Sequence, residues 1–211
     1  MYLTDEGKSK KQRWLISHNL HVNLLSSRLL FSAMKILFFI LATLTTSCAW
    51  GQTAKNRQSP LAIASARYKD TYLKITYSEP RKNGREIFGK LVPFGQVWRL
   101  GANEATELTC THDIFLSGKL LKAGTYSLFA IPENEKWTLI INSDVGLWGS
   151  YNYNAKADVM RIDAPVSSIP DKDVYELFTI KIDQKTDSAQ LIFLWDRTQA
   201  SLPIRFTEPK P

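Results

Sequence analysis

The densest group of polar side chains in the sequence lies between residues 97 and 106, which read Val-Trp-Arg-Leu-Gly-Ala-Asn-Glu-Ala-Thr. Burying such groups without hydrogen-bond partners costs about 1–3 kcal/mol each, so they either form an internal network or face a ligand. The guanidinium group of Arg99 suits a carboxylate, a phosphate or a hydroxyl. The alternative is a structural corner, in which Arg99 pairs with Glu104 and Asn103 bonds local backbone.

A second group of candidate binding residues lies in the stretch 142–158, which is rich in Gly and Asn and contains Trp148, Tyr151 and Tyr153. Exposed aromatic rings can pack against sugar rings while neighbouring polar groups bind hydroxyls. The stretch could instead fold back on the core, with Trp148 as its anchor. We expect a cleft between this stretch and residues 97–106 that binds a polar small molecule or glycan. The expected ligand contacts are Arg99, Asn103, Glu104, Trp148 and Tyr153.

Catalysis is the alternative function, namely hydrolysis with Glu104 as the acid/base and His112 or Asp158 as its partner. Glycoside hydrolysis would need two carboxyl groups roughly 5–9.5 Å apart. His112 is the only histidine after residue 51. It continues the alternation of Leu108 and Cys110, which favours a position inside the core. The sequence does not decide whether the protein is an enzyme.

Other kinds of chemistry find little support. Cys110 and His112 lie two positions apart, but zinc sites need three or four ligands. Neither a glycine-rich phosphate loop nor a Gly-x-Ser-x-Gly turn is present, which argues against nucleotide binding of that type and against a serine hydrolase. We therefore expect no metal and no cofactor.

The N-terminal part of the chain resembles an export leader. Residues 36–44 form an apolar run that is too short to cross a bilayer, which takes about 20 helical residues, but fits the hydrophobic region of a signal peptide. Lys35 precedes this run, and small residues stand at the expected places before a cut at Gln52. The expected segments are an upstream gene-model extension (1–33), a signal peptide (34–51) and a flexible tether (52–58). A genuine long leader beginning at residue 1 is the alternative.

Cys48 offers a second route of processing. Residues 44–48, Leu-Thr-Thr-Ser-Cys, resemble the cleavage box of lipoproteins, in which the cysteine becomes lipidated, although Thr45 fits that box poorly. Either route places the protein in the periplasm or cell envelope. The only membrane contact expected is a lipid anchor at Cys48.

The net charge of +7 is concentrated in the leader. The first 51 residues hold six of the 27 Lys/Arg and two of the 20 Asp/Glu, which leaves the remainder with a net charge of +3. Arg81, Lys82 and Arg85 cluster in a turn-rich stretch and are interpreted as a solvated loop tip. Export and the modest charge argue against nucleic acid as a partner.

The elements that must position these residues are expected to be strands. A composition of 44% hydrophobic and 22% charged residues is ordinary for a globular protein. Apolar residues recur with a period of two, separated by turn residues, and no stretch shows helical periodicity. The expected strand runs are 73–77, 107–111, 126–130, 137–141, 177–182 and 191–195. This pattern predicts a single all-β domain over residues 59–207, an antiparallel β-sandwich or jelly-roll-like barrel with little helix.

Several short motifs in a fixed order carry a resemblance to a family. They include Ile-Thr-Tyr-Ser-x-Pro at 75–80, Val-Trp-Arg-x-Gly-Ala-Asn-Glu-x-Thr at 97–106 and Ala-Gly-Thr-Tyr-Ser-Leu at 123–128. From about Ser59 to Phe206 the chain resembles an exported bacterial family known as domain of unknown function 2911. The resemblance implies a secreted β-rich domain. It supplies neither an activity nor catalytic residues.

Overall fold

The computed structural model describes residues 32, 34–35, 38 and 57–208. Residues 32, 34, 35 and 38 are helical. None of the helices in the described residues is long and apolar enough to span a membrane. The expected cleavage site before Gln52 and the candidate lipidation site Cys48 lie outside the described residues.

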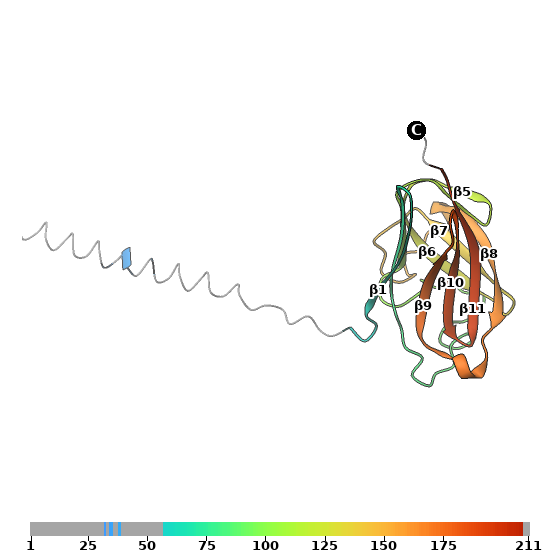
Figure 1. The fold of residues 1–211 in the computed structure, drawn as a ribbon. Helices are drawn as coiled ribbons and strands as arrows, with labels where there is room; N and C mark the ends of the chain where they lie inside the picture. Colours follow the sequence, from blue (N-terminus) through green and yellow to red (C-terminus); the bar gives the residue numbers. More distant parts are fainter. Residues whose placement is uncertain (1–31, 33, 36–37, 39–56, 209–211) are drawn as a thin grey trace, which may run out of the picture. The chain divides into compact units, whose positions relative to one another are not determined.

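Residues 57–208 form strands joined by turns and two 3-10 helices, with no α-helix in that range (Figure 1). Each predicted strand run lies within an observed strand, except that the run 107–111 extends one residue past the end of its strand at Cys110. The strands are β1 (Leu61–Tyr68), β2 (Thr71–Ser78), β3 (Thr106–Cys110), β4 (Ile114–Leu116), β5 (Lys119–Leu121), β6 (Gly124–Pro132), β7 (Lys136–Asn142), β8 (Asp158–Ser168), β9 (Tyr175–Gln184), β10 (Ser188–Asp196) and β11 (Thr198–Phe206). The 3-10 helices are η2 (Ala155–Ala157) and η3 (Asp171–Asp173).

The strands form one antiparallel sheet in the order β1-β2-β3-β6-β7-β8-β11-β10-β9, with β4 paired to β11 and β5 paired to β4. The sheet curls until its two outer strands, β1 and β9, face each other, giving a nearly closed barrel (Figure 1). The prediction of an all-β antiparallel fold is therefore confirmed, and of its two forms the barrel describes the sheet better.

Side chains and loop backbone close the seam between β1 and β9. The hydroxyl of Tyr77 accepts a hydrogen bond from the backbone N–H of Ile180 at 3.0 Å. The side chain of Gln184 accepts from the N–H of Arg67 at 3.2 Å and donates to its carbonyl at 2.8 Å. Near one end, the N–H of Phe178 donates to the carbonyl of Pro80 at 3.0 Å. These contacts satisfy strand edges that would otherwise be free to pair with other chains.

The barrel interior is apolar and holds an aromatic cluster at one end. Trp98 and Trp195 are stacked with ring centroids 5.9 Å apart, and Trp137 and Phe178 contact Trp98 edge-on at 5.8 and 5.0 Å. A smaller cluster lies on the outer face of β6 and β7, where the loop after β7 covers Phe129 and Ile140. This second cluster explains why β6 and β7 are apolar on both faces.

Candidate functional site

Residues 97–106 form a tight loop whose two ends are bonded together. Trp98 exchanges backbone hydrogen bonds with Ala130 of β6 at 2.8 and 2.9 Å. The N–H of Thr106 donates to the carbonyl of Arg99 at 3.1 Å, and its hydroxyl donates to the carbonyl of Leu100 at 2.6 Å. Both Thr106 and Leu100 are fully buried, so these bonds fix the position from which the Arg99 side chain projects.

The loop has an unusual backbone. Leu100 and Asn103 have φ angles of 56° and 58°, a left-handed region that is costly for a bulky residue such as leucine. A Cβ atom at Gly101 would lie 2.9 Å from the carbonyl oxygen of Ser78, which explains the glycine. Strained residues of this kind persist only where the surrounding structure holds them in place, and they are often found at functional sites.

Asn103 and Glu104 hold the loop against the segment that precedes β1. The amide of Asn103 donates to the carbonyl of Ser59 at 3.3 Å and to the hydroxyl of Ser78 at 3.4 Å. Glu104 forms a two-fold ion pair with Arg57, with N–O distances of 2.8 and 3.0 Å. Burial alone would raise the pKa of Glu104, but Arg57 outweighs it and the pKa lies below its usual value. The alternative pairing of Arg99 with Glu104 is not formed.

Arg99 lines a hollow of about 280 Å³ beside the aromatic cluster. The hollow, called the Arg99 hollow below, is lined by Gln58, Ser59, Pro80, Arg81, Asn83, Arg85, Leu91, Val92, Trp98, Arg99, Gly101, Ala102 and Trp195. Its lining contains three arginines and no carboxylate. Guanidinium groups gathered around one hollow repel each other, and an anion would relieve that repulsion.

The segment after β2 brings two of these arginines to the hollow. The backbone of Arg81 forms an isolated antiparallel β-bridge with that of Leu177 in β9. Arg85 folds back over the turn, where its Nε donates to the carbonyl of Lys82 at 2.9 Å. Lys82 itself pairs with Asp196 at 2.5 Å. In the described part of the chain, no acidic side chain pairs with Arg81, Arg85 or Arg99.

Two buried donors in the lining have no hydrogen-bond partner among the described residues. They are Nε of Arg99 and Nε1 of Trp195. The Trp195 side chain is almost entirely enclosed, with 1% of the residue exposed. Native proteins satisfy most buried donors, so an unsatisfied one needs an explanation. Here two such donors belong to residues that line one positively charged hollow, which is the pattern expected of an anion site.

The loop between β7 and β8 contacts the 97–106 loop, as the expected cleft required. The N–H of Ala105 donates to the carbonyl of Leu147 at 2.9 Å, and the N–H of Gly149 donates to the carbonyl of Asn103 at 3.0 Å. The hollow between the two loops has about 390 Å³ and is lined by Glu104 but not by Arg99, Trp148 or Tyr153. Trp148 is 58% exposed, so it does not anchor this loop to the core.

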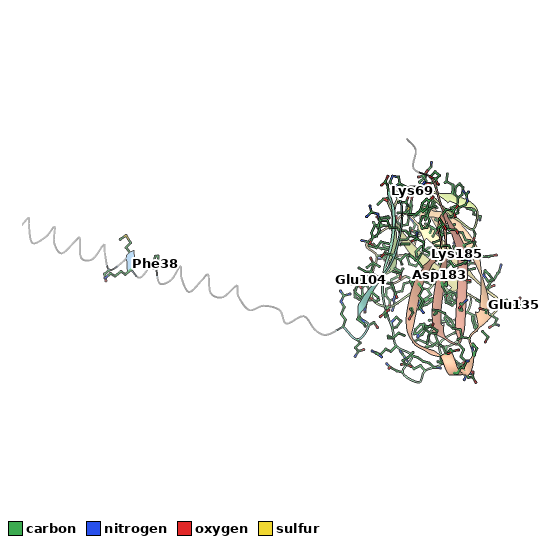
Figure 2. All side chains as sticks on the ribbon, viewed as in Figure 1. Phe38, Lys69, Glu104, Glu135, Asp183 and Lys185 are labelled. Atoms are coloured by element: carbon green, nitrogen blue, oxygen red, sulfur yellow. The ribbon has the colours of Figure 1, made fainter. Side chains whose placement is uncertain are left out.

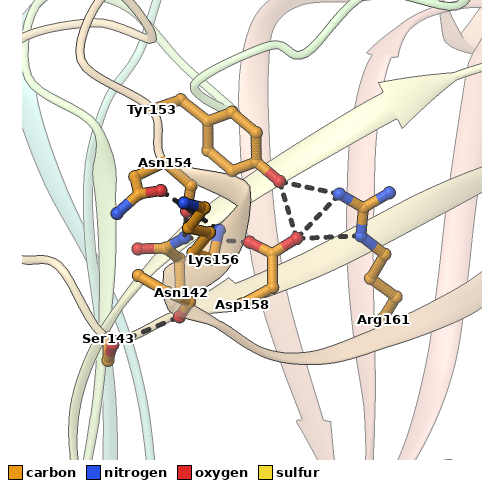
Figure 3. A network of polar contacts seen from close by, with 8 residues as sticks. Asn142, Ser143, Tyr153, Asn154, Lys156, Asp158 and Arg161 are labelled. Atoms are coloured by element: carbon orange, nitrogen blue, oxygen red, sulfur yellow. Dashed lines mark hydrogen bonds and ion pairs between the residues drawn. The ribbon is translucent and has the colours of Figure 1, made fainter.

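Tyr153 holds the β7–β8 loop against the outer face of the sheet. Its ring packs against Phe129 with centroids 5.1 Å apart. Its hydroxyl donates to Oδ2 of Asp158 at 2.6 Å and accepts from Arg161 at 2.8 Å (Figure 3). Oδ1 of Asp158 accepts from the amide of Asn142 at 2.8 Å. Tyr153 and Asp158 thus belong to one structural network, in which both carboxylate oxygens are occupied.

The structure does not bring Glu104 together with either expected catalytic partner. Glu104 and His112 lie beyond opposite ends of β3, whose five residues span about 13 Å at ~3.3 Å per residue. In Figure 2, Lys69 marks the β1–β2 turn, near the end of β3 that leads to His112, and Glu104 lies well away from it. Asp158 begins β8, which β6 and β7 separate from β3 in the sheet order, and its carboxylate is bonded to Asn142, Tyr153 and Arg161 instead of lying against Glu104. His112 lies outside β3, because the strand ends at Cys110, so the alternation of Leu108 and Cys110 does not extend to it, and its side chain is half-buried.

Only four of the thirteen residues that line the Arg99 hollow belong to the 97–106 motif. Arg81 and Arg85 are exposed, as expected of a solvated tip, and both also contribute to the lining of the Arg99 hollow. Trp195 was expected in the core and lies there, yet its indole N–H is unpartnered among the described residues. Among those same residues, no group of three or more His, Cys, Asp or Glu is placed to hold a metal ion.

Comparison with known proteins identifies a family but not an activity. Residues 59–204 match the model of the family described as Protein of unknown function (DUF2911). No curated protein and no solved structure matches the chain. Because the matched range covers most of the chain and the whole strand order up to β11, this protein belongs to the DUF2911 family.

Proposed function

We propose that this protein is an exported binding module that holds a small, polar, anionic molecule in the Arg99 hollow. One observation carries the proposal: two buried donors, Nε of Arg99 and Nε1 of Trp195, have no partner among the described residues and come from side chains that line a hollow with three arginines and no carboxylate. A bound carboxylate or phosphate would offer both donors an acceptor and would neutralise clustered positive charge.

The expected affinity is moderate. A hydrogen bond to a charged group contributes about 1.5–3 kcal/mol, so two give roughly 3–6 kcal/mol, in the range of a millimolar Kd at −4.1 kcal/mol or somewhat tighter. A hollow of about 280 Å³ corresponds to roughly nine molecules of liquid water at ~30 Å³ each. The ligand is therefore a molecule of metabolite size.

The lining favours binding over chemistry. It contains no His, Cys, Asp or Glu that could act as a general acid or base. Glu104 is held by Arg57 outside this hollow. Export, the other part of the proposal, rests on the leader pattern of residues 34–51. N-terminal sequencing of the protein from its host tests it, since an unprocessed start at Met1 would contradict export.

Calorimetric titration of the full chain tests the binding proposal, with acetate, citrate and inorganic phosphate as probes. At least one anion is expected to bind with a Kd of about 1 mM or tighter. Arg99→Lys keeps the charge but loses the planar donor group, and should weaken binding at least tenfold. Arg67→Lys, on β1 outside the lining, is the matched control and should bind as the wild type does. No binding of any probe, or equal binding by Arg99→Lys, would contradict the proposal.

A further inference from the structure

An exposed aromatic ring lies beside the Arg99 guanidinium group. A Cβ atom placed on Gly149 would be 3.0 Å from two ring carbons of Tyr151 and 3.8 Å from Nη1 of Arg99. Because both groups are measured from the same point, the ring edge and Nη1 lie less than about 7 Å apart. The β7–β8 loop therefore places an aromatic side chain beside Nη1 of Arg99, just outside the lining of the Arg99 hollow.

Tyr151 has the properties of a stacking platform. It is 83% exposed, so a ligand can reach its ring. The ring lies against the backbone of Gly149, which is itself buried and has a φ angle of 68°. A larger residue at position 149 would therefore meet both an unfavourable backbone conformation and the Tyr151 ring. Flat aromatic faces offer apolar contact area to ring-shaped ligands at little conformational cost.

The Arg99 hollow also offers neutral hydrogen-bonding groups. Gln58, Ser59 and Asn83 are part of its lining. Amide and hydroxyl side chains both donate and accept hydrogen bonds. They therefore suit a ligand that carries hydroxyl groups better than an aromatic acid, which has no hydroxyl groups for them to bind. The combination is an anion site, hydroxyl-binding side chains and a nearby aromatic face.

We propose that the ligand is an acidic sugar, a monosaccharide carrying a carboxylate or a phosphate, with the anion at Arg99 and the sugar ring against Tyr151. This inference rests on the proposed anion-binding function and narrows it to one class of ligand. Carboxylate and phosphate share the same chemistry toward a guanidinium group, so the experiment includes both.

The test is calorimetric titration of the full chain with glucuronate, glucose 6-phosphate, glucose, acetate and inorganic phosphate. At least one acidic sugar should bind tenfold or more tightly than the free anion of its kind, while glucose should show no binding. Whether glucuronate or glucose 6-phosphate binds identifies the acidic group. Tyr151→Ala should remove the tenfold advantage and leave binding of the free anion unchanged, whereas Tyr151→Phe should retain it. Tyr72→Ala, an exposed tyrosine of β2, is the matched control and should have no effect.

The outcomes separate the two proposals. If free anions bind but the acidic sugars bind no more tightly, or if Tyr151→Ala keeps the full sugar advantage, the acidic-sugar inference is overturned and the anion-binding function stands. If none of the five probes binds, both fail.

Discussion

Replacement of Arg99 by methionine should make the protein more stable while abolishing ligand binding. The Nε atom of Arg99 is buried without a partner among the described residues, and such a donor costs about 1–3 kcal/mol. Methionine keeps much of the aliphatic stem and removes the unsatisfied donor together with one of three clustered charges. We expect the free energy of unfolding to rise by about 1 kcal/mol, which raises Tm by roughly 2–4 °C for a domain of this size.

The assay is urea unfolding followed by tryptophan fluorescence, with Arg161→Met as the control. Arg161 donates to the carboxylate of Asp158 at 2.7 Å and to the hydroxyl of Tyr153 at 2.8 Å. Removing it leaves a mostly buried carboxylate short of a partner, so this variant should lose about 1–3 kcal/mol. A loss of more than 1 kcal/mol in Arg99→Met would refute the reasoning, because it would show that the guanidinium group is a structural partner instead of a ligand contact.

Two further predictions concern stability. Thr106→Val removes the buried hydrogen bond to the carbonyl of Leu100 and should lower the free energy of chemical unfolding by about 1–2 kcal/mol. Thr109→Val, at an exposed hydroxyl of the same strand, should change that free energy by less than about 0.5 kcal/mol. Equal effects of the two substitutions would contradict the proposed role of Thr106. Hydrogen bonds from Lys136 and then Thr138 hold the pKa of Asp163 below its usual value, so its contribution is present at neutral pH and is lost as the pH falls through the folded-state pKa. Asp163→Asn should therefore lower Tm at pH 7 but not at about pH 2, and a difference that persists at pH 2 would exclude this cause.

The strands that could be predicted from sequence are those with large apolar residues on the inner face. Residues 73–77 and 137–141 alternate clearly because one face packs into the barrel. Strand β1 was missed because its buried inner positions are alanines, Ala64 and Ala66, which carry little strand signal. Strand β8 was missed because only Ile162 and Ala164 are buried in its eleven residues.

The site was only partly predictable for a different reason. The density of polar groups directed attention to residues 97–106, and the contact of this loop with the β7–β8 loop was expected. The other groups lining the Arg99 hollow come from residues 58–59, 80–85, 91–92 and 195, which no spacing rule connects. Whether a donor such as Trp195 Nε1 has a partner is a property of the folded molecule, so the sequence pattern does not contain it.

Closure of the barrel and assembly of the proposed site depend on the same segment. The N–H of Lys82 donates to the carbonyl of Glu176 at 2.7 Å, and the carbonyl of Pro80 accepts from Phe178 at 3.0 Å, so residues 80–82 join the seam beside β9. Arg81 lies between these two bonds, in the lining of the Arg99 hollow. The hollow therefore forms only when β2 and β9, more than 90 residues apart in the chain, have come together. A ligand that bridges Arg81 and Arg99 would in turn stabilise this closure, because it binds only the state in which both side chains face the same space.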